Sequence, residues 1–302
     1  MKTLIVILGP TAVGKTETCL SLAESLHLPI ISADSRQIYK GIPIGTATPN
    51  SLQQARVKHY MVECLNLADY YNAAMYEQDV LALLKRLFND SDIALMSGGS
   101  MMYIDAVCNG MGTLPTVSPE LRQKMKERLQ SEGLQSLCDE LQALDPEYYK
   151  IVDTHNYRRV IHALEIIHTT GSTFSSLRTG VKKQRPFRIV KIGLIRPRQE
   201  LYQRINNRVD EMITQGLETE ARSVYHLKET NALNTVGYKE LFEYFEGRFS
   251  LQEAIERIKG NTRRYCRKQL TWFKRDPDVK WIDISQSDNE QILEQIRRIL
   301  QP

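Results

Sequence analysis

Near its start the chain carries residues whose types and spacing can bind phosphate. Gly9, Gly14, Lys15 and Thr16 fit the pattern GxxxxGK[ST], directly after an apolar run and before a segment with helical spacing. In such a loop the backbone N–H groups point at phosphate oxygens, the lysine supplies a positive charge, and the threonine hydroxyl can bind Mg²⁺. We therefore predict a loop that binds a diphosphate or nucleotide group. Its residues are Gly9, Pro10, Thr11, Ala12, Val13, Gly14, Lys15 and Thr16.

The apolar run at residues 93–96 is the candidate strand for a metal-binding acid, but no Asp or Glu directly follows it. Proteins that hydrolyse a nucleotide with this kind of loop normally hold the metal with an Asp at the end of a nearby strand. Here residues 93–96 lead into Ser97, Gly98 and Gly99. The sequence therefore favours a transferase whose loop holds a diphosphate leaving group. A small-molecule or nucleotide kinase stays open as an alternative, because it would use the same loop.

Further residues could complete such a site. Asp34 follows the apolar residues 29–33, so a parallel sheet would place it at the same edge as the phosphate loop. Arg204 and Arg208 are four residues apart on a predicted helix and share one face, where they could meet a diphosphate. Ser100 can donate a hydrogen bond to a ligand. The plainer readings are helix caps for Asp34 and Ser100 and a solvated helix face for the arginines.

A basic segment near the C-terminus favours RNA as a partner. Residues 257–275 contain eight Lys or Arg and no acid, interleaved with Tyr265, Trp272 and Phe273. Positive charge and aromatic rings together suit phosphate contacts and stacking on unpaired bases. A second run without acids covers residues 182–198. A solvated helix face remains an alternative for the charges, and a core position for Trp272.

The apolar pattern predicts an α/β fold. Strands are expected at residues 4–8, 29–33, 93–96, 187–195 and 279–284, and long helical patterns at 199–227 and 251–273. Between them, helix starts at Ser118-Pro119, Asp145-Pro146 and Asn156, with a stop at Gly171, predict an all-helical insertion. We therefore expect a P-loop NTPase-like core with a parallel sheet, formed by residues 1–112 and 186–302, and a helical insertion domain at 113–185.

Composition narrows the setting without fixing the function. The net charge is +4, and hydrophobic residues make up 42% of the chain, which is typical of a globular protein. The five cysteines are scattered and form no CxxC pair, so a disulfide framework or zinc site is not expected. No signal or membrane segment is visible in the sequence. These observations predict a cytoplasmic protein, and we expect a monomer.

Several motifs resemble those of the tRNA dimethylallyltransferases. The likeness begins at Asp34-Ser35-Arg36-Gln37-Ile38-Tyr39 and covers almost the whole chain. It continues through Gly45-Thr46-Ala47, Gly98-Gly99-Ser100, Arg158-Arg159-Val160-Ile161-His162, Val236-Gly237-Tyr238-Lys239-Glu240, Thr262-Arg263-Arg264 and Lys268-Gln269-Leu270-Thr271-Trp272. Ser100 and Thr48 stand where the family usually has Thr and Lys, and the zinc-finger extension of eukaryotic members is not expected here.

The resemblance implies a reaction and a set of roles. The N6 amine of the adenosine 3′-adjacent to the anticodon would attack dimethylallyl diphosphate and expel diphosphate, in the presence of Mg²⁺. Asp34 would be the general base, and Lys15, Thr16, Arg208 and Ser100 would act on the diphosphate or the adenine. The tRNA anticodon stem-loop would contact Asp34, Ser35, Arg36, Gln37, Ser100, Arg158, Arg159, His162, Arg263, Arg264, Arg267 and Lys268. Gln37 could read the adenine edge. A nucleotide-gated RNA-binding module without chemistry is a further alternative.

Overall fold

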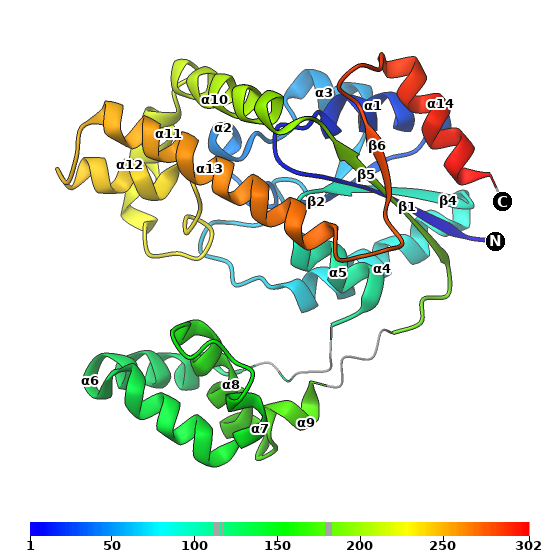
Figure 1. Cartoon of the computed structure of the whole chain (residues 1–302). Coiled ribbons are helices and arrows are strands. Elements are labelled where there is room, and N and C mark those ends of the chain that lie inside the picture. The colour runs from blue at the N-terminus through cyan, green and yellow to red at the C-terminus, as the bar shows by residue number, and fades with distance from the viewer. Residues whose placement is uncertain (112–114, 116, 179–182, 302) are drawn as a thin grey trace. The chain divides into compact units, whose positions relative to one another are not determined.

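A computed structural model describes the chain except for residues 112–114, 116, 179–182 and 302. It consists of two compact units, one formed by Met1–Cys108 with Arg185–Pro302 and the other by Asn109–Gln184 (Figure 1). The sequence predicted the insertion at residues 113–185, so its expected start lies four residues after Asn109 and its expected end one residue after Gln184. Each unit has its own hydrophobic core and is described by itself.

The first unit contains a six-stranded, wholly parallel sheet, which confirms the predicted α/β class. The strand order is β3-β2-β4-β1-β5-β6. The strands are β1 (Thr3–Leu8), β2 (Ile30–Ala33), β3 (His59–Tyr60), β4 (Ile93–Gly98), β5 (Arg188–Ile195) and β6 (Lys280–Asp283). In the register, Leu8 and Ala33 both pair with Gly98. The loops after β1, β2 and β4 therefore leave the sheet at one edge.

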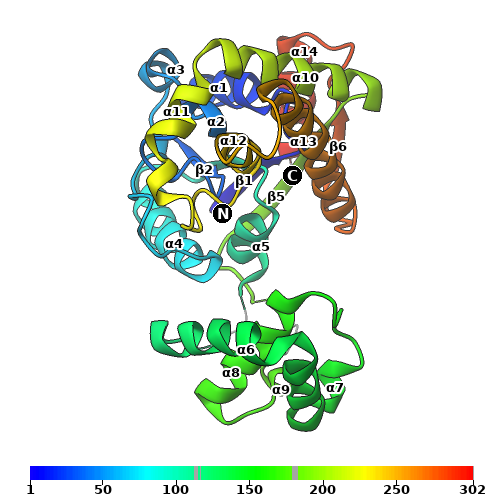
Figure 2. The same cartoon turned by 90° about the vertical axis from the view of Figure 1, so that its left-hand side faces the viewer.

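Helices cover both faces of this sheet because the central strand is apolar on both sides. On β1, Leu4 and Val6 pack into one core, and Ile5 and Ile7 into the other. Figures 1 and 2 show the two helical layers. The helices are α1 (Lys15–Leu26), α2 (Pro43–Thr46), α3 (Ser51–Arg56), α4 (Ala73–Asp90), α5 (Met101–Asn109), α10 (Arg198–Thr214), α11 (Leu217–Ser223), η1 (Tyr225–Leu227), α12 (Tyr238–Phe245), α13 (Leu251–Phe273) and α14 (Asn289–Leu300).

Two helical patterns that looked alike in sequence behave differently. The pattern at 251–273 forms one continuous helix, α13, which begins at a capping box of Ser250 and Glu253. The pattern at 199–227 is not one helix, because Gly216 adopts a left-handed conformation with φ of 101° and separates α10 from α11. A residue at positive φ ends a right-handed helix, and glycine does so at the least cost.

The second unit is helical, as the sequence predicts. It contains α6 (Pro119–Leu144), α7 (Pro146–Tyr149), α8 (Tyr157–Thr170) and α9 (Phe174–Leu177). Ser118 and Asp145 cap α6 and α7 with their side chains, whereas Asn156 precedes α8 without a side-chain capping bond. Gly171 ends α8 at φ of 70°. Within the described residues of both units, no helix has the length and apolarity needed to cross a membrane.

Candidate active site

The loop after β1 wraps tightly because its first residue has no side chain. Gly9 has φ of 155°, and a Cβ there would lie only 2.7 Å from the carbonyl oxygen of Leu194. Lys15, the first residue of α1, folds back over the loop. Its Nζ donates hydrogen bonds to the carbonyl oxygens of Gly9 at 2.9 Å and Pro10 at 2.8 Å. The hydroxyl-bearing Thr16 is exposed at the start of α1. This is the geometry of a phosphate-binding loop.

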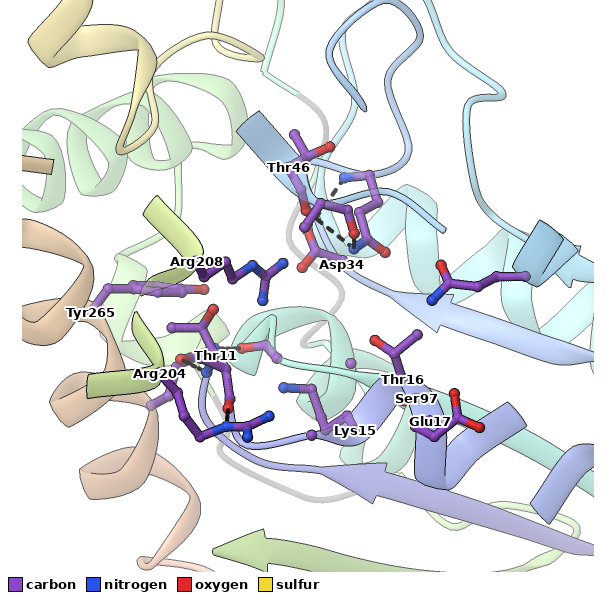
Figure 3. A pocket seen from close by; sticks show the side chains of 18 of the residues that line it. Thr11, Lys15, Thr16, Glu17, Asp34, Thr46, Ser97, Arg204, Arg208 and Tyr265 are labelled. Atoms are coloured by element: carbon purple, nitrogen blue, oxygen red, sulfur yellow. Dashed lines mark hydrogen bonds between the residues drawn. The ribbon is translucent and has the colours of Figure 1, made fainter. Parts of the chain in front are cut away.

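A cavity of about 530 Å³ opens beside this loop (Figure 3). Three parts of the first unit build it: the loop and start of α1, the segments after β2 and β4, and helices α10 and α13. The predicted site residues that line it are Thr11, Ala12, Gly14, Lys15, Thr16, Asp34, Gln37, Arg204 and Arg208. Residues far apart in sequence are therefore brought to one space at the carboxyl edge of the sheet.

Asp34 both shapes its own turn and faces the cavity. Its Oδ1 accepts hydrogen bonds from the backbone N–H of Arg36 at 2.8 Å and of Gln37 at 3.3 Å. This confirms a local capping role for the carboxylate. Its Oδ2 has no hydrogen-bond partner within the described part of the chain. One oxygen is thus fixed by the backbone, and the second is available to a ligand in the cavity.

Two cations face this carboxylate across the cavity. Burial and the neighbouring Arg208 lower the pKa of Lys15 to about 8, against the opposing effect of Asp34. Burial also lowers the pKa of Arg208, while the negative charge of Asp34 opposes the change. Arg204, one turn earlier on α10, donates from Nε to the carbonyl oxygen of Ala12 at 2.8 Å. Cations gathered beside the phosphate loop suit a polyanionic ligand.

The predicted contact Ser100 lies elsewhere. It lines a second cavity, of about 340 Å³, rather than the first. Its Oγ accepts a hydrogen bond of 2.7 Å from the backbone N–H of Ser35 and donates one of 3.2 Å to the hydroxyl of the same residue. The side chain is 6% exposed. The structure therefore places Ser100 in a wall, where the protein already uses its hydrogen-bonding capacity.

The neighbouring Arg36 and Gln37 are also engaged by the protein. The guanidinium of Arg36 donates to the carbonyl oxygens of Asn231 at 2.5 Å and Ala232 at 3.3 Å. The carboxamide of Gln37 donates to the carbonyl oxygens of Thr46 at 3.2 Å and Ala47 at 2.9 Å. Gln37 therefore holds a turn that lines the cavity, and in this structure its donors do not face an adenine edge.

The basic helix α13 presents its predicted RNA-binding residues unevenly. Arg264, Arg267 and Lys268 are exposed, whereas Arg263 is half-buried and donates to Asn206 Oδ1 at 2.5 Å. The three aromatic residues of this segment are not equally accessible, and the alternative of a core position for Trp272 is favoured. Phe273 is buried in the core, and the indole N–H of Trp272 donates to Asp105 Oδ2 at 2.8 Å. Only Tyr265 of these three lines the cavities described here.

The second basic run serves the fold of the first unit. Arg185 pairs with Glu77 at 2.7 Å, and both side chains are buried. Lys191 pairs with Asp276 at 2.6 Å, and Arg196 donates to the carbonyl oxygen of Val13 at 2.8 Å. These charges anchor β5 to its neighbours. Lys182 lies outside the described residues.

The predicted tRNA contacts of the insertion lie together on α8. Arg158 and Arg159 are exposed. The ring of His162 lies edge-on to Phe174, with centroids 5.7 Å apart, and 3.7 Å separates its Nδ1 from Glu165 Oε2. The His162 side chain is therefore only half exposed. Arg158 donates from Nε to the hydroxyl of Tyr157 at 3.1 Å, and both arginines are accessible to a partner surface.

Sequence reasoning missed Gln269 as a site residue. It is 2% exposed, its Oε1 accepts from the backbone N–H of Thr11 at 2.9 Å, and its Nε2 donates to the carbonyl oxygen of Gly99 at 2.8 Å. A usable signal was present, because Gln269 lies one turn after Tyr265 and is an uncharged polar residue on that face of a basic helix.

The fold and the cavity define a P-loop α/β protein in which Lys15, Arg208 and Asp34 line one cavity. Residues 37–276 match the family described as IPP transferase. The chain belongs to this family.

Relatives with assigned names match this chain over almost its full length. The chain is 55% identical to tRNA dimethylallyltransferase 1 of Bacteroides thetaiotaomicron, covering 98% of this chain and 96% of the relative. It is 58% identical to the protein of the same name from Phocaeicola vulgatus, covering 92% and 93%. Among solved structures, the tRNA isopentenylpyrophosphate transferase of Bacillus halodurans is 34% identical with a TM-score of 0.74, covering 99% of this chain and 96% of that one. A eukaryotic dimethylallyltransferase acting on tRNA has a TM-score of 0.84 at 25% identity, covering 98% and 78%.

Proposed function

We propose that this protein transfers the dimethylallyl group of dimethylallyl diphosphate to N6 of the adenosine 3′-adjacent to the anticodon in tRNA, releasing diphosphate. The relatives carry the name of this activity over nearly the whole chain, and none of the comparisons favours the kinase alternative. The observation that carries the proposal is the single cavity in which Lys15, Arg208 and Asp34 meet.

The residues of the cavity have two roles in this reaction: some stabilise the leaving diphosphate, and Asp34 accepts the proton of the attacking amine. The bond between C1 of the dimethylallyl group and the diphosphate oxygen breaks, and its electron pair leaves with the diphosphate. Loop N–H groups, Lys15 and Arg208 stabilise this growing negative charge. The adenine N6 forms the new bond to C1 and gives up a proton, which the unpartnered Oδ2 of Asp34 accepts. General-base assistance of this kind is typically worth about 10²–10⁴-fold in rate.

The residues at the loop fit a bound Mg²⁺. The exposed hydroxyl of Thr16 is a hard oxygen donor beside the phosphate loop. Among the described residues no cluster of three or more His, Cys, Asp or Glu could hold a metal alone. Mg²⁺ prefers one or two protein ligands together with phosphate and water, so one hydroxyl plus a diphosphate suits it. When bound, the ion would neutralise charge on the leaving group.

The acceptor must reach the cavity with its base unstacked. An adenine stacked in an anticodon loop has to be turned out to bring N6 to Asp34. We propose that the exposed Arg264, Arg267 and Lys268 of α13, and Arg158 and Arg159 of the second unit, contact the tRNA backbone. The five cysteines are free, in keeping with a reducing cytoplasm. A cytoplasmic location and a monomeric state remain predictions.

A transfer assay tests the proposal. Full-length protein, Mg²⁺ and dimethylallyl diphosphate labelled in the allyl group are incubated with an unmodified tRNA anticodon stem-loop, with and without the reactive adenosine. Label is expected on the adenosine-containing RNA alone, and a chelator should abolish it. Folded protein that transfers no label contradicts the proposal. ATP-dependent phosphate transfer without RNA would establish the kinase instead, and RNA binding without any turnover a binding module.

A further inference from the structure

The two cavities of the first unit are separated by a thin wall. Consecutive residues face opposite sides of it: Asp34 lines the 530 Å³ cavity and Ser35 the 340 Å³ cavity, and Gly99 and Ser100 are divided in the same way. Tyr265 of α13 lines both cavities, and it alone does so among the described residues that form them. The wall therefore consists of two loop crossings and one aromatic side chain.

Ser100 joins the two loop crossings of this wall. Its Oγ is bonded to both the backbone N–H and the hydroxyl of Ser35, and Tyr265 lines both cavities beside them. Figure 3 shows the Tyr265 side chain reaching into the first cavity from α13, on the side of Arg204 and Arg208. The ring is 36% exposed, which leaves much of its surface open to the cavities.

The first cavity places this ring near the reacting atoms, because Tyr265 and Asp34 both line it. Burial raises the pKa of Tyr265, and the negative charge of Asp34 raises it further, so the two side chains interact and the phenol stays protonated at neutral pH. In the proposed reaction the allylic carbon gains positive charge as the diphosphate leaves. An aromatic face attracts a cation, and it also occupies space that water would otherwise fill.

Water is the competing nucleophile in this chemistry. Its oxygen can form the bond to C1 while the same carbon–oxygen bond to diphosphate breaks. The products are then 3-methylbut-2-en-1-ol and diphosphate, and the proton goes to Asp34. The carboxylate does not discriminate between an amine and water, so another feature has to do so.

We infer that the ring of Tyr265 is the partition that directs the allyl group to the amine of the acceptor base and keeps water from the allylic carbon. This rests on the proposed transfer reaction. The base enters by the second cavity, between Ser35 and Ser100, and meets the donor at the edge of the ring. The ring itself excludes water.

A product-partition experiment tests this role with Tyr265→Phe and Tyr265→Ala. Each variant and the wild type turn over labelled dimethylallyl diphosphate with saturating unmodified tRNA. Three quantities are measured: label on tRNA, free 3-methylbut-2-en-1-ol and released diphosphate. Wild type and Tyr265→Phe should deliver nearly all label to tRNA, because both keep the ring. In Tyr265→Ala the alcohol produced per diphosphate should rise at least about tenfold. The KM for the donor should change by less than about threefold, because the phosphate loop is untouched.

The outcomes separate the inference from the function on which it rests. Wild type that neither labels tRNA nor releases diphosphate contradicts the transfer reaction itself. Wild type that transfers normally, with Tyr265→Ala dividing its products as wild type does, overturns the partition alone. So does an Ala variant that loses transfer without forming more alcohol, since that result means lost base stacking. Thermal unfolding verifies folding, and Tyr265→Leu, which keeps volume but lacks the ring, replaces Ala if that variant does not fold.

Discussion

The carboxamide oxygen of Gln269 accepts a 2.9 Å hydrogen bond from the backbone N–H of Thr11 in the phosphate loop. The amide nitrogen of the same side chain donates to the carbonyl oxygen of Gly99 at 2.8 Å. A Cβ on Gly99 would lie 2.4 Å from that nitrogen, so the glycine is what allows the contact. One buried side chain of α13 therefore fixes the spacing between the loops that follow β1 and β4.

Replacing Gln269 with Leu should loosen both loops. The backbone N–H of Thr11 and the carbonyl of Gly99 lose their partner in a buried place, which costs about 1–3 kcal/mol of unfolding free energy. The KM for dimethylallyl diphosphate should rise, because the loop that binds the diphosphate is no longer held. Denaturant unfolding and initial rates measure the two effects. Thr271→Ala, an exposed change two residues away on α13, is the control and should alter neither.

The carboxylate of Asp34 is tested best by Asp34→Asn. The Asn Oδ1 can still accept from the backbone N–H groups of Arg36 and Gln37, so the turn should survive. The amide cannot take a proton, and turnover should fall by about 10²–10⁴-fold. Equilibrium binding of donor and of tRNA, measured separately, should stay near the wild-type level. A turnover within about twofold of wild type would exclude Asp34 as the base.

Most of the sheet and the phosphate loop could be predicted because their signals are local. Uninterrupted apolar runs identify β1, β2 and β4, and the spacing of Gly9, Gly14 and Lys15 identifies the loop. The break at Gly216 was missed. A single glycine is tolerated inside a continuous helix, and only the tertiary packing decides that a turn forms at this position.

Side-chain roles were harder to predict because they depend on contacts between distant residues. Ser100 was expected to contact the diphosphate or the adenine, and it lines the second cavity, bonded to Ser35, 65 positions away. Trp272 has the right composition for base stacking, yet its N–H is bound by Asp105. Gln269 bridges two loops through partners 258 and 170 positions away, a relationship that periodicity cannot reveal.

The lowered pKa of Lys15 predicts a limit on activity at alkaline pH. In the ligand-free protein this pKa is about 8, so kcat/KM for the donor should fall as the pH rises through that value and the ammonium charge is lost. A bound diphosphate favours the charged form, so the fall in kcat should come at higher pH. Rates between neutral pH and about 9.5 test this. In Arg208→Gln the fall in kcat/KM should move to higher pH, because Arg208 helps to lower the Lys15 pKa. If the pH dependence of kcat/KM is the same in Arg208→Gln as in the wild type, the loss of activity at alkaline pH belongs to a group other than Lys15.

The lowered pKa of Lys15 should make stability change with pH in the direction opposite to activity. Its folded pKa of about 8 is below the ordinary 10.5, so between these values the unfolded chain binds more protons. The unfolding free energy of the ligand-free protein should therefore rise with pH through this window, and the contribution should be lost as the pH falls through about 8. Lys15→Met, which cannot titrate, is the control. Its unfolding free energy should lack this part of the pH dependence.

Glu220 should affect catalysis through the turn at residues 44–47, which is distant from it in sequence. Its carboxylate accepts from the backbone N–H groups of Ile44 and Gly45, both at 2.8 Å, and from the hydroxyl of Tyr238 at 2.5 Å. The next two residues of this turn, Thr46 and Ala47, accept hydrogen bonds from the carboxamide of Gln37. The backbone N–H of Gln37 in turn donates to the carboxylate of Asp34. Glu220→Gln replaces one acceptor oxygen with a donor that faces an N–H group, so the turn should shift.

A misplacement of about 1 Å at the reacting atoms can cost up to about 100-fold in rate, so kcat of Glu220→Gln should fall while the KM for the donor changes little. Gln37→Ala acts on the same turn, and the double variant should lose much less than the product of the two single losses. Glu218→Gln is the matched control on α11, where Glu218 forms only a surface pair with Arg222 at 3.0 Å and contributes little. Losses in kcat that simply multiply in the double variant would mean that Glu220 stabilises the fold without positioning Asp34.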